Sequence, residues 1–188
     1  MSTTSVGRPG KYQRSAGGLI AALVITVVAV GGLLWFLGLF RADVDNRPEP
    51  IDYRSSIDDA QEGRLDPVYL GSLPDGWIAT KFDVEPAGED SAFATGLFTD
   101  DEKFVGIEQQ TATVDSLLDS YVDKDATTTD IFRADGSVAD AWQGYEDAGG
   151  DAAYASTVHG QTVLVYGDVA PGVLQDVIDR LTTAPVTR

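Results

Sequence analysis

The chain has 188 residues, a formal net charge of −17 and no cysteine. Without thiols it can form no disulfide bond, no zinc–thiolate centre and no cysteine nucleophile. All 30 acidic residues follow residue 42, so residues 41–188 carry a formal charge of −20, which repels phosphate backbones and argues against nucleic-acid binding.

The first predicted element is a membrane-spanning helix over residues 15–40, a stretch without any charged residue. A helix of that length reaches about 39 Å, more than the roughly 30 Å hydrocarbon core of a bilayer. Arg8, Lys11 and Arg14 precede it with no acidic residue among them, so the positive-inside rule places the N-terminus in the cytoplasm. The apolar run is longer than that of a signal peptide and ends in a poor cleavage site, which favours an uncleaved anchor over a cleaved leader.

These features predict a single-pass cell-membrane protein whose C-terminal part lies outside the cytoplasm. Pro48 and Pro50 interrupt any helix that continues beyond the span, and only residues 55–61 have the pattern of a short helix start. Ile51, Tyr53 and Ile57 are candidates for contact with the folded part. The predicted divisions are a basic cytoplasmic arm at 1–14, the transmembrane helix at 15–40, a linker at 41–64 and an extracytoplasmic α+β domain at 65–188.

The periodicity of the apolar residues changes several times along residues 65–188. Two-residue alternation predicts strands, and recurrence at three- and four-residue intervals predicts helices. The connections between strands have hairpin lengths, which favours an antiparallel sheet packed by two helices on one face, an α+β architecture. Strands are predicted over residues 77–85, 92–99, 103–111, 130–133, 139–146, 152–159 and 162–166, and helices over 113–122 and 171–183.

The many carboxylates raise the question of a metal site. The segment 123–127 begins like an EF-hand loop, but Thr128 and Ala134 stand where that loop needs glycine and glutamate. The cluster Asp100–Glu102 has the position of a turn tip between two strands. We therefore expect solvated acids, and no metal and no cofactor.

Motifs for catalysis and phosphate binding are missing from the sequence. His159 is the one histidine and precedes a glycine turn, where an exposed turn residue is the favoured interpretation. Neither Gly-x-Ser-x-Gly, Ser-x-x-Lys nor a phosphate-binding glycine loop is present in the sequence. No catalytic, cofactor-binding or metal-binding residue is predicted, and we expect the protein not to be an enzyme.

Aromatic residues offer the remaining functional indication. On strands they more often pack in the core than line a sugar or peptide groove. The leading hypothesis is a binding or interaction module of the cell envelope; the alternatives are a small envelope hydrolase and a structural partner of another membrane protein. The aromatic residues concerned are Trp77, Trp142, Tyr145, Tyr154 and Tyr166.

Two short motifs follow the basic arm and the span. One is Leu-Pro-x-Gly-Trp from Leu73 to Trp77, and the other is Gly-x-x-Val-x-Val-x-Gly from Gly160 to Gly167. Over residues 15–184 this order resembles the domain of unknown function 4245 family, membrane proteins of high-GC Gram-positive bacteria. The resemblance implies an anchored exterior domain without an assigned activity, so it supplies no site residue. The partners that we expect are the lipid bilayer, through residues 15–40, and an envelope protein or ligand.

Overall fold

The computed structural model describes residues 48–85 and 91–186. These residues belong to the second of two compact units of the chain, Arg47–Arg188. The predicted arm, the predicted span and residues 41–47 of the predicted linker lie outside the described residues. No helix within 48–85 and 91–186 is both long enough and apolar enough to cross a bilayer.

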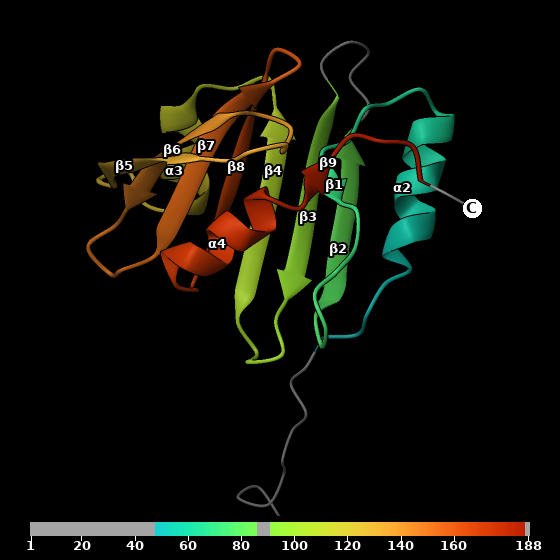
Figure 1. Ribbon diagram of the computed structural model, residues 1–188, viewed down its shortest axis with the longest axis horizontal. Coiled ribbons are helices and arrows are strands. Elements are labelled where there is room, and N and C mark those ends of the chain that lie inside the picture. Colours follow the sequence, from blue (N-terminus) through green and yellow to red (C-terminus); the bar gives the residue numbers. More distant parts are fainter. Residues whose placement is uncertain (1–47, 86–90, 187–188) are drawn as a thin grey trace, which may run out of the picture. The chain divides into compact units, whose positions relative to one another are not determined.

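Within these described ranges, seven strands form one antiparallel sheet in the order β2-β3-β4-β8-β7-β6-β5 (Figure 1). Each overlaps a predicted strand, so the predicted antiparallel α+β class is confirmed. Because β4 pairs with β8, the two halves of the folded part meet at the centre of the sheet. The strands are β2 (Ile78–Glu85), β3 (Ala92–Phe98), β4 (Phe104–Gln110), β5 (Thr127–Arg133), β6 (Ala141–Glu146), β7 (Ala152–Val158) and β8 (Gln161–Gly167).

The two predicted helices are present as α3 (Val114–Tyr121) and α4 (Pro171–Ile178). Thr113 caps α3, since its side chain accepts a hydrogen bond from the Ser116 backbone N–H. Helix α4 ends earlier than the predicted residue 183. The chain beyond it forms the strand β9 (Leu181–Thr182), which pairs with β1 (Tyr69–Leu70) in a small second sheet.

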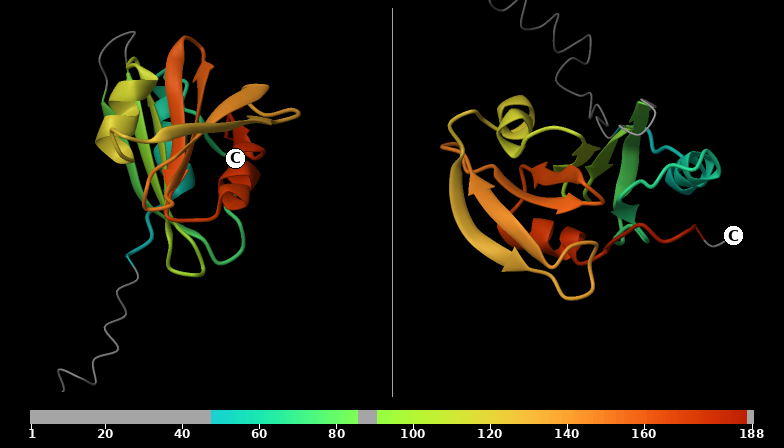
Figure 2. Two further views of the ribbon diagram at one scale, coloured as in Figure 1. Left: turned by 90° about the vertical axis from the view of Figure 1, so that its left-hand side faces the viewer. Right: turned by 90° about the horizontal axis from the view of Figure 1, so that it is seen from above.

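The two helices cover opposite faces of the large sheet, so the prediction that they share one face is wrong (Figure 2). Ala153, Ala155 and Leu164 pack with α3, whereas Tyr154 and Val165 belong to the core that contains α4. Successive residues of a strand point to opposite faces, and β7 and β8 are apolar on both. These two strands therefore need a helix on each side.

A further helix, α2 (Tyr53–Glu62), packs beside β2 on the face that carries α4. Asp52 caps it by accepting a hydrogen bond from the Ser55 backbone N–H. Its Tyr53 side chain is buried, and its hydroxyl accepts a hydrogen bond from the Leu70 backbone N–H at 3.1 Å. The short helix predicted over residues 55–61 is confirmed, and it begins two residues earlier, at Tyr53. The folded part begins before the expected Leu65, because α2 supplies core residues.

The buried position of Ile57 gives a test of this earlier boundary. Its side chain is 1% exposed, so Ile57→Ala should lower the free energy of unfolding of the full-length protein by about 2–4 kcal/mol. Ile131→Ala is the matched control, because Ile131 is 55% exposed and its truncation should change stability by less than about 0.5 kcal/mol. Urea unfolding followed by tryptophan fluorescence measures both values. Equal stability of the two variants would show that α2 is not part of the cooperative core.

Candidate functional site

A cavity of about 450 Å³ lies at one end of the large sheet, which is within the range of small-ligand sites. Three segments that are distant in the sequence form it: the loop that precedes β2, the turn between β3 and β4, and helix α4. Its lining residues are Pro74, Trp77, Thr99, Asp100, Asp101, Lys103, Val169, Ala170, Val173, Asp176, Val177 and Arg180. We call this cavity the Trp77 groove.

The loop carrying the Leu-Pro-x-Gly-Trp motif forms one wall of the Trp77 groove. A turn closes it, with the Trp77 backbone N–H donating to the Pro74 carbonyl at 3.1 Å. Gly76 has a φ of +78°, and a Cβ on it would lie 2.9 Å from the Cβ of Asp100. Glycine therefore allows this loop to sit against the β3–β4 turn, which brings the half-buried ring of Trp77 into the groove.

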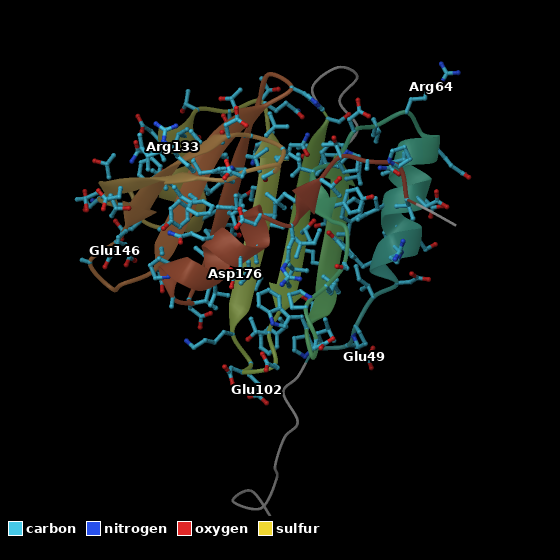
Figure 3. The ribbon with its side chains drawn as sticks, in the orientation of Figure 1. Glu49, Arg64, Glu102, Arg133, Glu146 and Asp176 are labelled. Carbon is cyan, nitrogen blue, oxygen red and sulfur yellow. The ribbon has the colours of Figure 1, made fainter. Side chains whose placement is uncertain are left out.

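Helix α4 forms the opposite wall. Asp176 and Val177 lie three and four residues after Val173, so these three side chains share one side of the helix, and Arg180 follows in the turn beyond its end (Figure 3 labels Asp176 on α4). Val173 is half-buried and contributes apolar surface, Val177 is buried beneath it, and the charged residues Asp176 and Arg180 stand at the exposed rim. Within 48–85 and 91–186 no ion pair involves Arg180.

Lys103 is the other cation of the groove, and Asp168 restrains it. The ammonium group donates a hydrogen bond to the Asp168 backbone carbonyl at 2.7 Å and lies 3.6 Å from its carboxylate. The same carboxylate accepts the Phe104 backbone N–H at 2.8 Å. Asp168 thus fixes the first residue of β4 and the direction of the lysine. The groove combines an aromatic wall, apolar valines and a rim of both charges, which suits binding of an amphipathic ligand.

A second candidate site lies on the sheet face that carries α3, over β2, β3 and β4. Residues paired across neighbouring strands share a face, and the pairs here place Ala94 beside Glu108 and Gly96 beside Gly106. A Cβ on Gly106 would overlap the ring of Tyr166, so glycine makes room for that ring. Tyr166 stacks obliquely on Tyr121 of α3, with ring centroids 5.4 Å apart.

Glu108 is the unusual residue of this face. It is 6% exposed, and desolvation raises its pKa to about 7, against the opposing effects of the Tyr121 hydroxyl and of Lys81. Lys81 forms its ion pair with Asp83 instead, at 2.9 Å, and no ion pair of Glu108 occurs in the described part of the chain. A cavity of about 120 Å³ adjoins the carboxyl group, and we call it the Glu108 cavity.

The structure distributes the aromatic residues between core and surface. Trp142 and Tyr154 are buried, as the favoured interpretation predicted. Tyr145 and Tyr166 are half-buried, and Trp77 lines the groove named after it. All five therefore pack in or against the two cores, as the favoured interpretation predicted, and Trp77 in addition lines the cavity. Whether any of them contacts a sugar or a peptide stays a prediction.

The remaining residues that the sequence brought forward as candidates lie in turns. His159 is exposed in the β7–β8 turn with a φ of +50°, as predicted. The cluster Asp100–Glu102 forms the predicted turn between β3 and β4. In the segment that begins like an EF-hand, the Asp123 carboxylate accepts the Asp125 backbone N–H at 2.7 Å, which is the geometry of a local turn.

Sequence reasoning did not single out Glu108, Asp176 or Arg180. Glu108 follows the alternation of β4, in which a polar residue normally marks a solvated face. Its burial depends on α3, whose residue Tyr121 covers it from a different part of the sequence. The groove likewise depends on the approach of α4 to a loop almost a hundred residues earlier in the chain.

The fold and its groove define an α+β domain with a ligand-sized depression between a motif-bearing loop and a C-terminal helix. The chain belongs to the family described as "Protein of unknown function (DUF4245)", whose match extends over residues 11–181. The resemblance inferred from the two short motifs is thereby confirmed. No curated protein and no solved structure matches the chain.

The raised pKa of Glu108 makes a contribution to stability that depends on pH. Between about pH 4.5 and pH 7, the Glu108 carboxyl group is protonated in the folded protein but ionised in the unfolded chain. Its contribution to stability is therefore fully present below about pH 4.5 and is lost as the pH rises to about 7. We expect the stability difference between wild type and Glu108→Gln to change by up to about 3 kcal/mol between pH 4 and pH 8, in favour of the variant at high pH. Urea unfolding at several pH values measures it.

Asp135→Asn is the matched control, because it removes one negative charge from an exposed turn. Its difference from wild type should stay almost constant over the same pH range. A pH-independent difference for Glu108→Gln would contradict the burial of this carboxyl group.

Proposed function

We propose that this protein is a non-enzymatic binding module of the cell envelope, anchored by residues 15–40 with its α+β domain outside the cytoplasm. The Trp77 groove is its binding site for an envelope ligand. The observation that carries the proposal is the convergence of the Leu-Pro-x-Gly-Trp loop and α4 on one ligand-sized cavity. The uncharged stretch 15–40 and the basic residues before it support the location.

The composition of the groove supports binding of an amphipathic ligand. A large aromatic ring and valine side chains provide apolar surface, and burial of such surface contributes about 25 cal/mol per Å². Charged groups at the rim orient a ligand without requiring their own complete desolvation. The groove is formed by backbone that is already ordered, so a ligand loses little binding free energy to rearrangement of the protein.

The absence of cysteine from the natural chain permits a direct test in living cells. Three single-cysteine variants are labelled with a membrane-impermeant maleimide, in intact cells and after purification. Val173→Cys reports on the groove, Asp135→Cys on an exposed turn that does not line it, and Ser5→Cys on the N-terminal arm. We expect Asp135→Cys to react equally fast in both conditions and Val173→Cys to react several-fold more slowly in cells, because a bound ligand covers it. Ser5→Cys should react only after lysis.

The two parts of the proposal fail in different ways. Equal rates for Val173→Cys in cells and after purification would contradict an occupied groove, whatever the topology. Labelling of Ser5→Cys but not of Asp135→Cys in intact cells would contradict the location, whatever the groove contains.

One observation favours the alternative, a small envelope hydrolase. Ser91 and His159 line the same hollow of about 320 Å³, together with Asp66. The side chain of Gln161 donates to the Ser91 backbone carbonyl at 2.7 Å, and that of Gln109 to the Asp66 carbonyl at 3.1 Å. These amide contacts connect the segment before β1, the residue before β3 and strand β8. The polar residues of the hollow therefore also hold these segments together.

A fluorophosphonate probe distinguishes the two functions, since it labels serine residues that are activated as nucleophiles. We expect no labelling of the full-length protein in its membranes. Labelling that is lost in Ser91→Ala and in His159→Ala, but kept in the control Ser156→Ala, would replace the binding proposal by the hydrolase.

A further inference from the structure

The Glu108 cavity lies on the opposite face of the large sheet from helix α4 and has no role in the proposed groove. Its lining includes the small residues Ala92 and Ala94 as well as Lys81, Glu108 and Tyr121. A volume of about 120 Å³ is too small for a drug-sized molecule and is suited to the end of one side chain or to a small amine.

The groups around the cavity have an unbalanced charge. Glu108 is buried without an ion-pair partner among the residues described, and the nearby cation Lys81 is engaged by Asp83. The Tyr121 hydroxyl lies close enough to the Glu108 carboxyl group to lower its pKa, and the Gln110 side chain acts in the same way on the pKa of Tyr121. These neutral contacts orient the carboxyl group, but they do not compensate its charge.

The surface beside the cavity is aromatic. Phe104 and Tyr121 are 38% and 37% exposed, and the ring of Tyr166 lies between them, with centroid distances of 5.8 Å and 5.4 Å. Aromatic faces attract organic cations and also bury their methylene groups. A carboxylate at the base of a small cavity with an aromatic neighbour is complementary to an ammonium group on an alkyl chain.

We propose that the Glu108 cavity binds a primary ammonium group, with the attached alkyl chain lying against the Tyr121 ring. The ammonium donates hydrogen bonds to the Glu108 carboxylate, and its positive charge replaces the hydration that burial removes from this group. The exposed carboxylates at the rim, Asp83 and Glu85, add attraction of longer range.

Binding is coupled to release of a proton. Because the carboxyl group without ligand titrates near pH 7, it is mostly protonated at pH 6, and a cation binds only after the proton has left. The apparent affinity should therefore fall about tenfold from pH 8 to pH 6. The titratable groups that face Glu108 are Lys81, Asp83 and Glu85 of β2, Tyr121 of α3 and Tyr166 of β8.

The test uses the full-length protein in lipid nanodiscs and n-butylammonium chloride as the probe, at constant ionic strength. The side-chain carboxyl signals of ¹³C-labelled glutamate are followed by NMR, and the signal that Glu108→Gln removes belongs to Glu108. We expect saturable binding at pH 8, about tenfold weaker binding at pH 6, and a fall in the pKa of Glu108 when the probe is bound. The uncharged n-butanol should produce none of these effects.

Two variants separate specific binding from general attraction to an acidic protein. Glu108→Gln should weaken binding at least tenfold, whereas Asp135→Asn removes the same charge elsewhere and should change it less than twofold. Tyr121→Phe keeps the ring but removes the hydroxyl that stabilises the carboxylate. In this variant the ammonium probe should still bind, but the pH at which binding is half-maximal should be higher, because the pKa of Glu108 rises.

A second ligand identifies the source of the ammonium group. The capped peptide acetyl-Gly-Lys-Gly-amide is compared with its norleucine counterpart, which lacks the charge. Tighter binding of the lysine peptide than of butylammonium assigns the site to a lysine side chain of a partner, and equal or weaker binding assigns it to a free amine. The proposal would be overturned if neither cation bound saturably to the wild type, or if both bound equally well to Glu108→Gln. Either result would leave the proposal for the Trp77 groove unaffected.

Discussion

The apolar character of both faces of β7 and β8 is the constraint on which the rest of the structure depends. Leu164 and its neighbours Val163 and Val165 are completely buried, although they point alternately to opposite sides of the sheet. A strand of this kind is stable only if each face is covered. Helix α3 covers one face and α4 the other, and the pairing of β4 with β8 connects this doubly covered centre to β2 and β3.

Both candidate sites lie where this coverage ends. Helix α4 packs on the centre of the sheet with Leu174, Val177 and Ile178, which leaves Val173 and Arg180 beside the motif-bearing loop. Helix α3 is eight residues long, and its last residue, Tyr121, lines the same cavity as Glu108 and Gln110 of β4. The face over β2 and β3 therefore remains without a described helix, and Glu108 lies at the boundary between covered and uncovered sheet.

The sequence predicted the local elements better than their arrangement. Alternation located the strands, and the interval of apolar residues located α3 and α4, because these signals need only neighbouring residues. Predicting which face of the sheet each helix covers requires more than these local signals. Residues 152–155, Ala-Ala-Tyr-Ala, are all buried, and an unbroken run of small and apolar residues does not say which side a helix will cover. Glu108 and Tyr121 are brought together only by the position of α3, which no local pattern specifies.

Burial, more than the number of acidic residues, decides whether a cation is bound specifically. Residues 41–188 contain 30 carboxylates, and exposed ones attract cations weakly because water and salt screen them within about 10 Å. Glu108 differs, since the protein has removed most of its hydration without providing an ionic partner, and a buried charge in that state is costly. Among the acidic residues within 48–85 and 91–186, Glu108 is the one whose burial an ammonium group would compensate. In a strongly acidic domain, a specific cation site is therefore recognised by a single poorly solvated carboxyl group beside a cavity, and clusters such as Asp100–Glu102 at an exposed turn do not have this property.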